Sequence, residues 1–507
     1  MDKIIKVAFA LLIIMKEHHN ESYDHVLKYT GVFGGVQGLI ILIGLVRNKI
    51  MALLIGAGGM GLSALLTSVQ NFASQCTNLG ISFGAVPRLS ELYEQESEQQ
   101  RIEHFILVVR LWSAMAALLG LVFCILLSPF VNKTTFTWGN HTLHYSALGL
   151  SVAMIAVTGG ENAILKATRR LGAMAKIQIY AALFSVLVSI PLYYYFGHSG
   201  VLPVIVLMAM GTMVATVLYS YKYYPFRLKI NRQLLAEGSS MVKLGVAFVV
   251  AAAIGSASEV LIRAFLNVEG GLDDVGFYNA GYMITITYAG MVFSAMESDF
   301  FPRLSAVNQD VAKTNETVNK QMEVSLLLLS PMLVALMMML PVLIPLLFTS
   351  EFLPVVGMAQ VAILAMFFKV LTLPVAYITL ARGRSLSFLF LETSYFVVFV
   401  IFMVFGFRLW GLYGTGVAIV AAHVFDYLMI NGYAYWKYDY RCTTQVLRYA
   451  GVQMMVGIVA FVISCVADGW FYWIAEAALT IVSTAYSVHI LRQKTHLWEA
   501  LMRKIRT

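Results

Sequence analysis

The sequence predicts an all-α, polytopic membrane protein with about fourteen transmembrane helices. Of its 507 residues, 59% are hydrophobic and only 12% are charged, and the mean hydropathy is +0.77. Because soluble proteins carry about 25% charged residues, so few charges cannot cover a surface in water. The apolar residues also fall in long runs, such as Leu326–Phe348. A helix needs roughly 20 apolar residues in a row to cross a bilayer.

Run length and helix-breaking residues place the individual spans in order along the chain. The predicted spans lie near residues 30–54, 60–84, 105–129, 143–165, 173–195, 201–221, 243–266, 276–301, 323–347, 355–380, 385–407, 411–436, 448–467 and 471–490. The longest segments between them are Glu91–His104, Lys222–Val242 and Pro302–Met322, and none is long enough to fold as a domain. The function is therefore expected to reside inside the membrane.

The positions of Lys and Arg predict which ends of the spans face the cytoplasm, because cytoplasmic loops carry an excess of basic residues. With both termini inside, 28 of the 35 Lys and Arg residues fall in inside segments. Both termini are therefore predicted to be cytoplasmic. The net charge of +8 is then mainly a topology signal, which argues against a nucleic-acid partner.

Two landmarks recur at one spacing and predict an internal repeat. Span two ends in AVPRLSEL (Ala85–Leu92) and span eight in FFPRLSAV (Phe300–Val307), so the shared PRLS recurs after 215 positions. Arg47 near the end of span one and Arg263 near the end of span seven lie 216 positions apart. Each repeat holds an even number of spans, so both halves point the same way through the membrane.

The repeat predicts three parts of the chain. Residues 1–222 form an N-terminal lobe of six spans, residues 223–440 a C-terminal lobe of six spans, and residues 441–507 two extra spans with a cytoplasmic tail. An axis along the membrane normal is expected to relate the lobes, as in some secondary transporters. We expect such lobes to enclose a central cavity and to rock between inward-open and outward-open states.

The stretches GLVRNKIMALLIGAGGMG (Gly44–Gly61) and GISFGAVPRLSELY (Gly80–Tyr93) resemble the first two spans of a known transporter group. The group is the multidrug/oligosaccharidyl-lipid/polysaccharide (MOP) exporter superfamily, and the likeness is greatest to its O-antigen (Wzx-like) and lipid II flippases. It rests on the GAG turn, the arginine and the PRLS-type span end, and it continues more weakly along all fourteen spans.

The resemblance implies a function. Flippases of this kind move an undecaprenyl-diphosphate-linked oligosaccharide from the inner to the outer leaflet of the bacterial cytoplasmic membrane by alternating access. The cargo is an O-antigen unit for lipopolysaccharide or another surface polysaccharide unit. The resemblance also implies membrane lipid and polysaccharide assembly enzymes as partners, and coupling to H⁺ or Na⁺.

The match to lipid II flippases is incomplete. A basic residue ends span one of these flippases, and Arg47 holds that place. Their further cavity arginines on spans two and eight have no counterpart in this sequence. This departure argues for a lipid-linked glycan other than lipid II.

Charged residues inside spans are costly in a bilayer, so each is a candidate for function. Arg47 and Arg263 lie at equivalent places in the two lobes, and Lys369 lies in the middle of span ten. We interpret these three cations as the binding site for the diphosphate. The open alternative for the arginines is that each snorkels to the outer interface. Arg110 either lines the cavity or snorkels, and the sequence assigns no role to Glu476.

Two acidic residues are candidates for ion coupling. Glu259 lies four residues before Arg263 on the same helical face. It is either the structural partner of that arginine or a site whose titration releases the arginine for substrate. Asp426 lies three residues after His423 on span twelve, and the two form either a proton relay or a satisfied hydrogen-bonded pair.

Uncharged polar residues are expected to line the part of the cavity that holds the sugars. They form a stripe on span two and another on the equivalent span eight: Asn71, Gln75 and Asn78, then Asn279 and Tyr282. Amides and hydroxyls suit sugar hydroxyls, because both kinds of group donate and accept hydrogen bonds. Hydrogen bonding between helices is the alternative role for these residues.

Two other functions compete with a flippase. A cation-coupled multidrug or metabolite antiporter of the same superfamily would want buried acidic residues in the N-terminal lobe, and spans one to three hold none. A membrane enzyme would need a catalytic motif, but HExxH, GxSxG and the P-loop are all missing from the sequence. The four cysteines lack paired spacing and are predicted to be free. We therefore predict a flippase rather than an enzyme, with no cofactor and no metal site.

Overall fold

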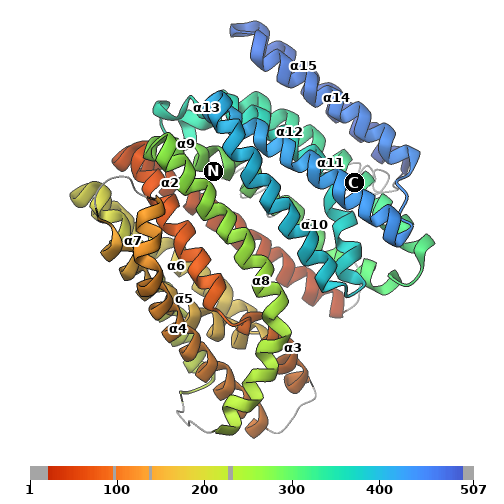
Figure 1. The fold of residues 1–507 in the computed structure, drawn as a ribbon. Helices are drawn as coiled ribbons and strands as arrows, with labels where there is room; N and C mark the ends of the chain where they lie inside the picture. Colours follow the sequence, from red (N-terminus) through yellow and green to blue (C-terminus); the bar gives the residue numbers. More distant parts are fainter. Residues whose placement is uncertain (1–20, 95–98, 136–139, 227–231, 495–507) are drawn as a thin grey trace. The chain divides into compact units, whose positions relative to one another are not determined.

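The computed structural model of the protein describes residues 21–94, 99–135, 140–226 and 232–494, and every regular element in these ranges is helical (Figure 1). The elements are α2 (Glu21–Thr77), α3 (Ile81–Glu94), α4 (Gln99–Thr135), α5 (Thr142–Ala167), α6 (Leu171–Phe196), η1 (Gly197–Gly200), α7 (Val201–Tyr223), α8 (Arg232–Glu269), α9 (Leu272–Tyr282), η2 (Met283–Tyr288), α10 (Ala289–Val307), α11 (Val311–Leu347), η3 (Ser350–Phe352), α12 (Val355–Ala381), α13 (Ser385–Tyr438), α14 (Thr444–Val466) and α15 (Gly469–Lys494). Both termini lie outside the described residues, so the prediction that they are cytoplasmic also falls on residues that are not described.

The predicted all-α membrane fold is confirmed. Ten helical stretches in the described chain are long and apolar enough to cross a membrane. Three of them, Val36–Thr77, Leu171–Tyr223 and Ser385–Tyr438, are 42, 53 and 54 residues long, and each contains two consecutive spans. The elements α9, η2 and α10 together form one more span. The described helices therefore account for fourteen spans.

Glycines with positive φ break the long helices where the chain turns back. Gly56 (φ 63°) divides α2, and Gly411 (φ 57°), preceded by the non-helical Trp410, divides α13. Residues that carry a Cβ rarely adopt this conformation, so glycine is the residue that fits each turn. Both breaks fall at the boundary between two spans that the sequence predicts as separate.

Span two is not the continuous helix that the sequence predicts. The structure ends α2 at Thr77 and begins α3 at Ile81, with positive φ at Leu79 (53°) and Gly80 (66°). Asn78 therefore lies in a turn, where its side-chain oxygen accepts a hydrogen bond from the backbone N–H of Gly80 at 2.8 Å. The polar stripe expected along this span is interrupted before Asn78. Span eight is irregular too, because η2 is a π-helix, a feature often found at functional sites.

The chain divides into two compact units, and the unit boundaries fall inside helices. The first unit comprises Met1–Met51, Thr77–Val122 and Leu148–Gly245, and the second comprises Ala52–Cys76, Phe123–Ala147 and Val246–Thr507. The core of the first unit joins α3, α4 and α5 through buried aliphatic side chains, including Ala85, Leu89, Val108, Val109 and Ile164. The lobes at 1–222 and 223–440, and the extra spans at 441–507, remain a proposal.

In the second unit, α12 is the most deeply buried helix. It packs along α13 and also contacts α11 and α14. Large side chains on it, such as Met366 and Phe367, are almost completely buried. α11 packs in turn against both α14 and α15, so the last two helices are attached to the second unit through α11.

Two segments of the second unit, one around Gly61 and one around Gly276, make reciprocal close contacts through their backbones. A Cβ added to Gly61 would lie 1.9 Å from the carbonyl oxygen of Leu272, and a Cβ added to Gly276 would lie 2.1 Å from that of Ala57. Gly61 and Gly276 are 215 positions apart, as are Ala57 and Leu272. This is the spacing of the PRLS repeat, and the glycines allow the two backbones to approach closely. The reciprocal contact supports the proposed internal repeat.

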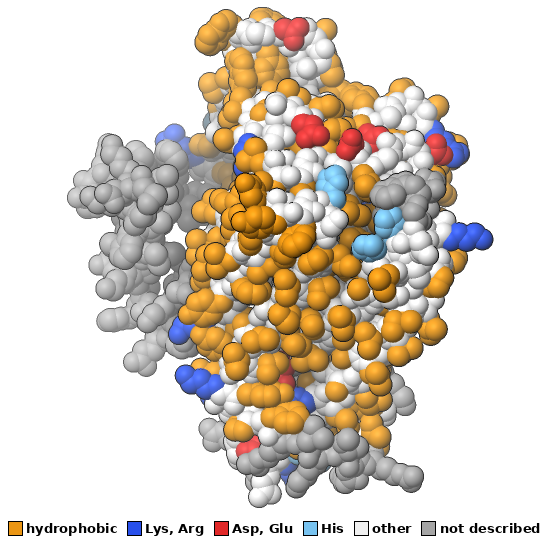
Figure 2. All heavy atoms as spheres, turned by 90° about the vertical axis from the view of Figure 1, so that its left-hand side faces the viewer, with side chains coloured by type: hydrophobic (Ala, Val, Ile, Leu, Met, Phe, Trp, Pro, Cys, Tyr) orange, Lys and Arg blue, Asp and Glu red, His pale blue; other side chains and the backbone are white. Residues whose placement is uncertain are grey.

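The surface agrees with a membrane environment. Figure 2 shows a face that is largely covered by hydrophobic side chains, with few charged atoms across the middle of the view. Large apolar side chains such as Leu187, Leu386 and Trp470 are mostly exposed. In water such a surface would be an aggregation liability, whereas in lipid it is the expected outer surface.

Candidate functional site

Arg47 lines a cavity of about 510 Å³ within the first unit. The wall of this cavity, which we call the Arg47 cavity, is formed by α2, α5, α6 and α7. The polar residues that share it with Arg47 are Gln37, Asn162, Gln178 and Thr212. Its size falls in the range of about 300–1,000 Å³ that is usual for ligand pockets.

The guanidinium of Arg47 has almost no partner in the described part of the chain. Its Nη1 donates only to the sulfur of Met208, at 3.6 Å, and its buried Nε has no hydrogen-bond partner there. A thioether is a weak acceptor, and none of the described residues that line the Arg47 cavity is acidic. Gln37 donates instead to Gln178 at 3.1 Å. The cavity therefore presents an uncompensated positive charge among amides and a hydroxyl.

Arg263, in the second unit, is held by polar groups on two helices. Its Nη1 donates to the Glu259 carboxylate at 3.0 Å, and its Nη2 donates to the Asn279 side-chain oxygen at 3.2 Å. The arginine side chain is 9% exposed and that of Glu259 is 40% exposed. The predicted pairing of Glu259 with Arg263 is therefore present, and its predicted role in ion coupling stays a prediction.

Lys369 belongs to a second group of charges in the same unit. It interacts electrostatically with Glu392 and Asp426 on α13, and with His423. Its ammonium also lies 5.8 Å from the centre of the Phe293 ring. Lys369 is thus flanked by acidic side chains, which the interpretation of it as a free diphosphate ligand did not anticipate.

Tyrosines connect these two groups of charges. Tyr282 interacts electrostatically with Glu259 and Arg263, and Tyr395 interacts with Tyr282, Glu392 and Asp426. The Tyr395 ring also meets the His423 ring edge-on, with centroids 5.6 Å apart. His423 itself contacts the backbone oxygen of Ile419 at 2.9 Å through Nδ1. The structure therefore gathers six predicted residues into one network of the second unit: Glu259, Arg263, Asn279, Tyr282, Lys369 and Asp426.

The two units differ in the balance of charge at these sites. Among the described residues that line it, the Arg47 cavity has one cation and no acidic residue. The network of the second unit has two cations, Arg263 and Lys369, among three carboxyl groups, those of Glu259, Glu392 and Asp426. The first arrangement suits an anion, whereas the second suits the binding of a proton or another small cation.

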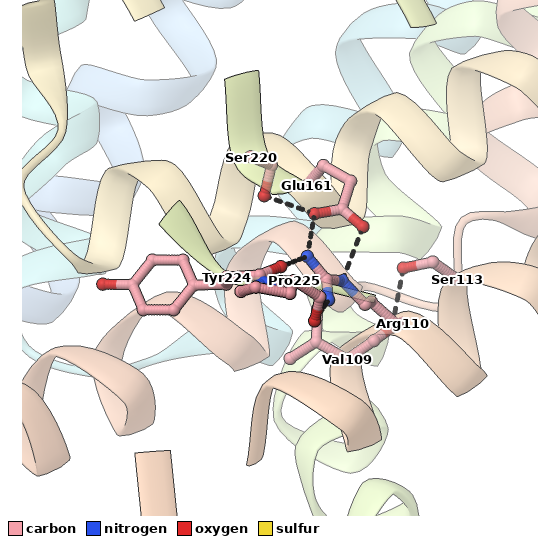
Figure 3. Close-up of polar contacts among 7 residues, drawn as sticks. All are labelled: Val109, Arg110, Ser113, Glu161, Ser220, Tyr224 and Pro225. Atoms are coloured by element: carbon pink, nitrogen blue, oxygen red, sulfur yellow. Dashed lines mark hydrogen bonds and ion pairs between the residues drawn. The ribbon is translucent and has the colours of Figure 1, made fainter. Parts of the chain in front are cut away.

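Arg110 forms the most complete polar cluster of the first unit (Figure 3). It makes a two-pronged ion pair with Glu161, with Nε at 2.8 Å and Nη2 at 3.2 Å from the carboxylate. It also donates to the carbonyls of Tyr224 (2.8 Å) and Pro225 (3.2 Å), and Ser220 donates to Glu161 at 2.5 Å. Four of the five N–H groups of its guanidinium are thus taken up by α5 and by the segment that follows α7.

The contacts of Arg110 decide between the two roles that the sequence allows for it, lining a cavity and snorkelling to the interface. Arg110 does not snorkel, since its side chain is only 7% exposed. It does line a smaller cavity of about 240 Å³, together with residues such as His104 and Glu103. Most of its donors are already occupied, and its charge is paired with Glu161, so we assign it a structural role in holding the end of α7.

The remaining predicted sugar ligands lie on or beside α2. Asn71 is exposed on α2, and Gln75 is half-buried one turn further along. Asn78 is engaged in the turn before α3. Their predicted role in sugar binding remains a proposal.

Sequence reasoning missed several polar residues at these sites. Glu161 and Glu392 are acidic residues inside predicted spans, and this alone could have flagged them. Asn162 and Gln178 of the Arg47 cavity gave a weaker signal, because an amide on a helix carries no charge. None of the described side chains forms a group of three or more His, Cys, Asp or Glu placed to hold a metal ion.

Comparison with solved structures relates the fold to known transporters. A lipid II flippase, MurJ, in an inward-closed conformation is similar with a TM-score of 0.67 and 13% identity, over 91% of this chain and 99% of that one. An inward-facing multidrug resistance MATE family transporter of the MOP superfamily gives 0.66 and 13%, over 79% and 94%. A MOP superfamily transporter from Pyrococcus furiosus gives 0.50 and 14%, over 80% and 93%. At these identities the likeness is one of fold.

Comparison by sequence identifies the family. A family model described as "Polysaccharide biosynthesis protein" matches residues 50–357, which is more than half of the chain. The comparison with curated proteins finds no match. The family match and the shared fold confirm the predicted resemblance to the polysaccharide branch of the MOP superfamily. This chain therefore belongs to the polysaccharide biosynthesis protein family and has the multispan fold of MOP transporters.

Proposed function

We propose that the protein is a flippase that moves an undecaprenyl-diphosphate-linked oligosaccharide from the inner to the outer leaflet of the bacterial cytoplasmic membrane. The observation that carries this proposal is the Arg47 cavity, which combines amides and a hydroxyl with a guanidinium that has no acidic partner among the described residues. The guanidinium fits a diphosphate oxygen, and the amides fit sugar hydroxyls. The family match supports a polysaccharide precursor as the cargo.

The charge of the cargo supplies a driving force for the proposed direction. A membrane potential that is negative inside favours outward movement of an anion by about 2.3 kcal/mol per charge per 100 mV. Two net negative charges would double this to about 4.6 kcal/mol. We propose that the acidic residues of the second unit, Glu259 and Asp426 among them, add coupling to H⁺ or Na⁺.

The cation sites differ in the role that we assign to them. Arg47 holds the diphosphate, because it has no acidic partner in the described chain. In the second unit, Arg263 and Lys369 become available to an anion once Glu259 and the α13 carboxyls take up a proton or cation. This order of binding couples transport to the cation. A cation bound in the second unit neutralises the carboxyl groups, and the basic side chains then present their positive charge to the substrate.

The test is a flipping assay in proteoliposomes with a prenyl-diphosphate-linked oligosaccharide. We expect the sugar headgroup to reach the far leaflet with wild-type protein and to stay behind with Arg47→Gln. Arg101→Gln is the matched control, because Arg101 is exposed at the start of α4 and its loss should leave transport intact. Wild-type transport by both Arg47→Gln and Arg263→Gln would rule out the assignment of the cation sites.

A cation-coupled multidrug or metabolite antiporter is the second candidate. The three carboxyl groups around Lys369 and Arg263 are the observation that favours it. The same vesicles distinguish the two functions when a cationic dye replaces the lipid-linked sugar. Gradient-driven dye movement without any movement of the glycan lipid would support the antiporter and overturn the flippase.

A further inference from the structure

Glu476 on α15 is a fully buried carboxyl group with no partner in the described chain. Its side chain is 0% exposed, and neither carboxyl oxygen has a hydrogen-bond partner. It forms none of the ion pairs found among the described residues. No step of the proposed transport uses it, and it lies outside the two proposed six-span lobes.

The buried face of α15 that carries Glu476 also carries hydroxyl groups. It shares the buried face of α15 with Tyr472, Ser483 and Ser487, while the opposite face exposes apolar residues such as Trp470 and Ile474. The Tyr472 hydroxyl donates to the Met338 carbonyl on α11 at 2.9 Å. This hydroxyl hydrogen is therefore already used and is not available to a Glu476 carboxylate.

The charged and titratable groups on the neighbouring helices are engaged elsewhere. α11 contributes Glu323, which pairs with Lys494 at the last residue of α15. α14 contributes Tyr449, whose ring meets that of Tyr486 at 6.3 Å. Arg448, beside it, also acts on Tyr486. Each of these groups lies more than two helical turns along α15 from Glu476, since a turn takes 3.6 residues.

An ionised carboxylate at this place would have nothing to stabilise it. Burying an isolated charge without a partner is so costly that the group is neutralised instead. A bound metal ion would need several oxygen ligands, and the described residues hold no group of three or more His, Cys, Asp or Glu placed to bind one. The remaining way to neutralise the group is a proton on one of its oxygens.

We propose that Glu476 is a proton-binding site, occupied in the packed state and exchanging its proton along the buried face of α15. Toward Lys494 on this face, a row of hydroxyl and amide groups begins at Ser483, about two helical turns beyond Glu476, and no hydrogen bond in the described chain joins Glu476 to it. Along it, Ser483 donates to Gln453 of α14 at 2.6 Å, and Gln453 donates to Ser487 at 2.8 Å. Loss of the proton would leave an uncompensated carboxylate where α15 packs on α11. The interface between these helices must then admit water or open.

Infrared difference spectroscopy on the full-length protein in lipid vesicles tests this proposal directly. A protonated carboxyl has a C=O stretch that the carboxylate lacks, and detecting it requires no reagent to reach the site. We expect a carboxylic-acid band at neutral pH in the wild type that is lost in Glu476→Gln and that disappears as the pH is raised. Glu316→Gln, at an exposed residue of α11, is the control and should leave the band unchanged.

A hydrophobic carbodiimide, dicyclohexylcarbodiimide, provides a second readout. The protonated acid adds across one C=N bond: the carboxyl oxygen joins the carbon and the proton moves to nitrogen. The acyl group then shifts to nitrogen and gives a stable N-acylurea, so no atom leaves. Peptide mass spectrometry should find this adduct on Glu476 and not on Glu316, with labelling that falls as the pH rises.

Three outcomes would overturn the proposal. The first is a neutral-pH spectrum without a carboxylic-acid band that depends on Glu476. The second is a band that persists unchanged across the whole pH range, which would make Glu476 a permanently neutral packing residue. The third is loss of the band on addition of Na⁺ at constant pH, which would make the site a metal-ion site. Thermal unfolding of Glu476→Gln, with its melting temperature near that of the wild type, verifies that the variant is folded.

Discussion

The arginines Arg110, Arg263 and Arg47 differ in how many hydrogen-bond partners each one has within the protein. Arg110 has a carboxylate, two carbonyls and an aromatic ring, since its guanidinium lies 4.4 Å from the centre of the Tyr221 ring. Arg263 has one carboxylate and one amide. Among the described residues, Arg47 has only a thioether as a hydrogen-bond acceptor. The fewer its internal partners, the more of the binding capacity of an arginine remains for a ligand.

The first prediction concerns the Arg110–Glu161 pair. Glu161→Gln should destabilise the protein by roughly 3–5 kcal/mol, because it leaves a buried arginine uncompensated. Replacing both residues by Met should cost clearly less than the sum of the single changes. The measurement is a double-mutant cycle from denaturant unfolding in detergent micelles. The exposed pair Glu316–Lys320 is the control, and its single substitutions should not change stability measurably.

The second prediction concerns Glu259. Glu259→Gln should strengthen the binding of inorganic diphosphate about tenfold, a change of about 1.4 kcal/mol, because Arg263 loses its carboxylate partner. Titration calorimetry on purified protein measures the affinity. Glu269→Gln is the matched control on the same helix, since Glu269 pairs with the exposed Arg408 at 2.5 Å. Unchanged or weaker diphosphate binding by Glu259→Gln would show that Arg263 does not meet the anion.

At the scale of elements, close backbone contacts join the segment Ala52–Cys76 of the second unit to the segment that begins at Val246. The third prediction is that Gly61→Ala and Gly276→Ala each destabilise the fold by roughly 1–3 kcal/mol or more, the usual cost of overpacking. The reason is that each new Cβ would collide with a backbone carbonyl that cannot rotate away. Gly432→Ala on α13 is the control, because its Cβ would meet nothing within 4 Å. Equal melting temperatures for all three variants would contradict the close contact.

Hydropathy predicted the order and number of the elements, because the apolar run is what the bilayer selects. It did not predict their true lengths. The predicted loop Glu91–His104 is mostly helix, since α3 continues to Glu94 and α4 begins at Gln99. Helices extend past the membrane wherever the polar residues at their ends tolerate helical geometry. The break at Asn78–Gly80 was missed because hydropathy does not report backbone conformation.

At the scale of the whole molecule, the sidedness of the chain is the main prediction that remains open. The fourth prediction uses a variant whose four native cysteines, all free in the structure, are replaced. In intact cells, a cysteine at Asn140 should react with a membrane-impermeant maleimide, and one at Gln100 should react only after permeabilisation. Both positions are exposed. The reverse pattern would overturn the orientation that the basic residues predict.

The site was less predictable from sequence than the fold. Intramembrane charges are easy to find, but their partners depend on how each helix is rotated against its neighbours. Arg110 and Glu161 lie 51 positions apart, and no pattern in the sequence links them. Lys369 was singled out from the sequence, while Glu392 on α13, which interacts with it electrostatically, was not. Pairing of charges between helices is therefore the step that required three-dimensional information.

The reciprocal contact of Gly61 and Gly276 has a consequence for the origin of the chain. When position i meets position j and the counterpart of i meets the counterpart of j, the interface is isologous, the arrangement that a two-fold dimer makes. A six-span ancestor pairing with its own copy would have needed only one such glycine for both sides of the axis. After fusion into one polypeptide the two sides mutate separately. That freedom allows one half to keep an arginine bare while the other half acquires a carboxylate beside its own.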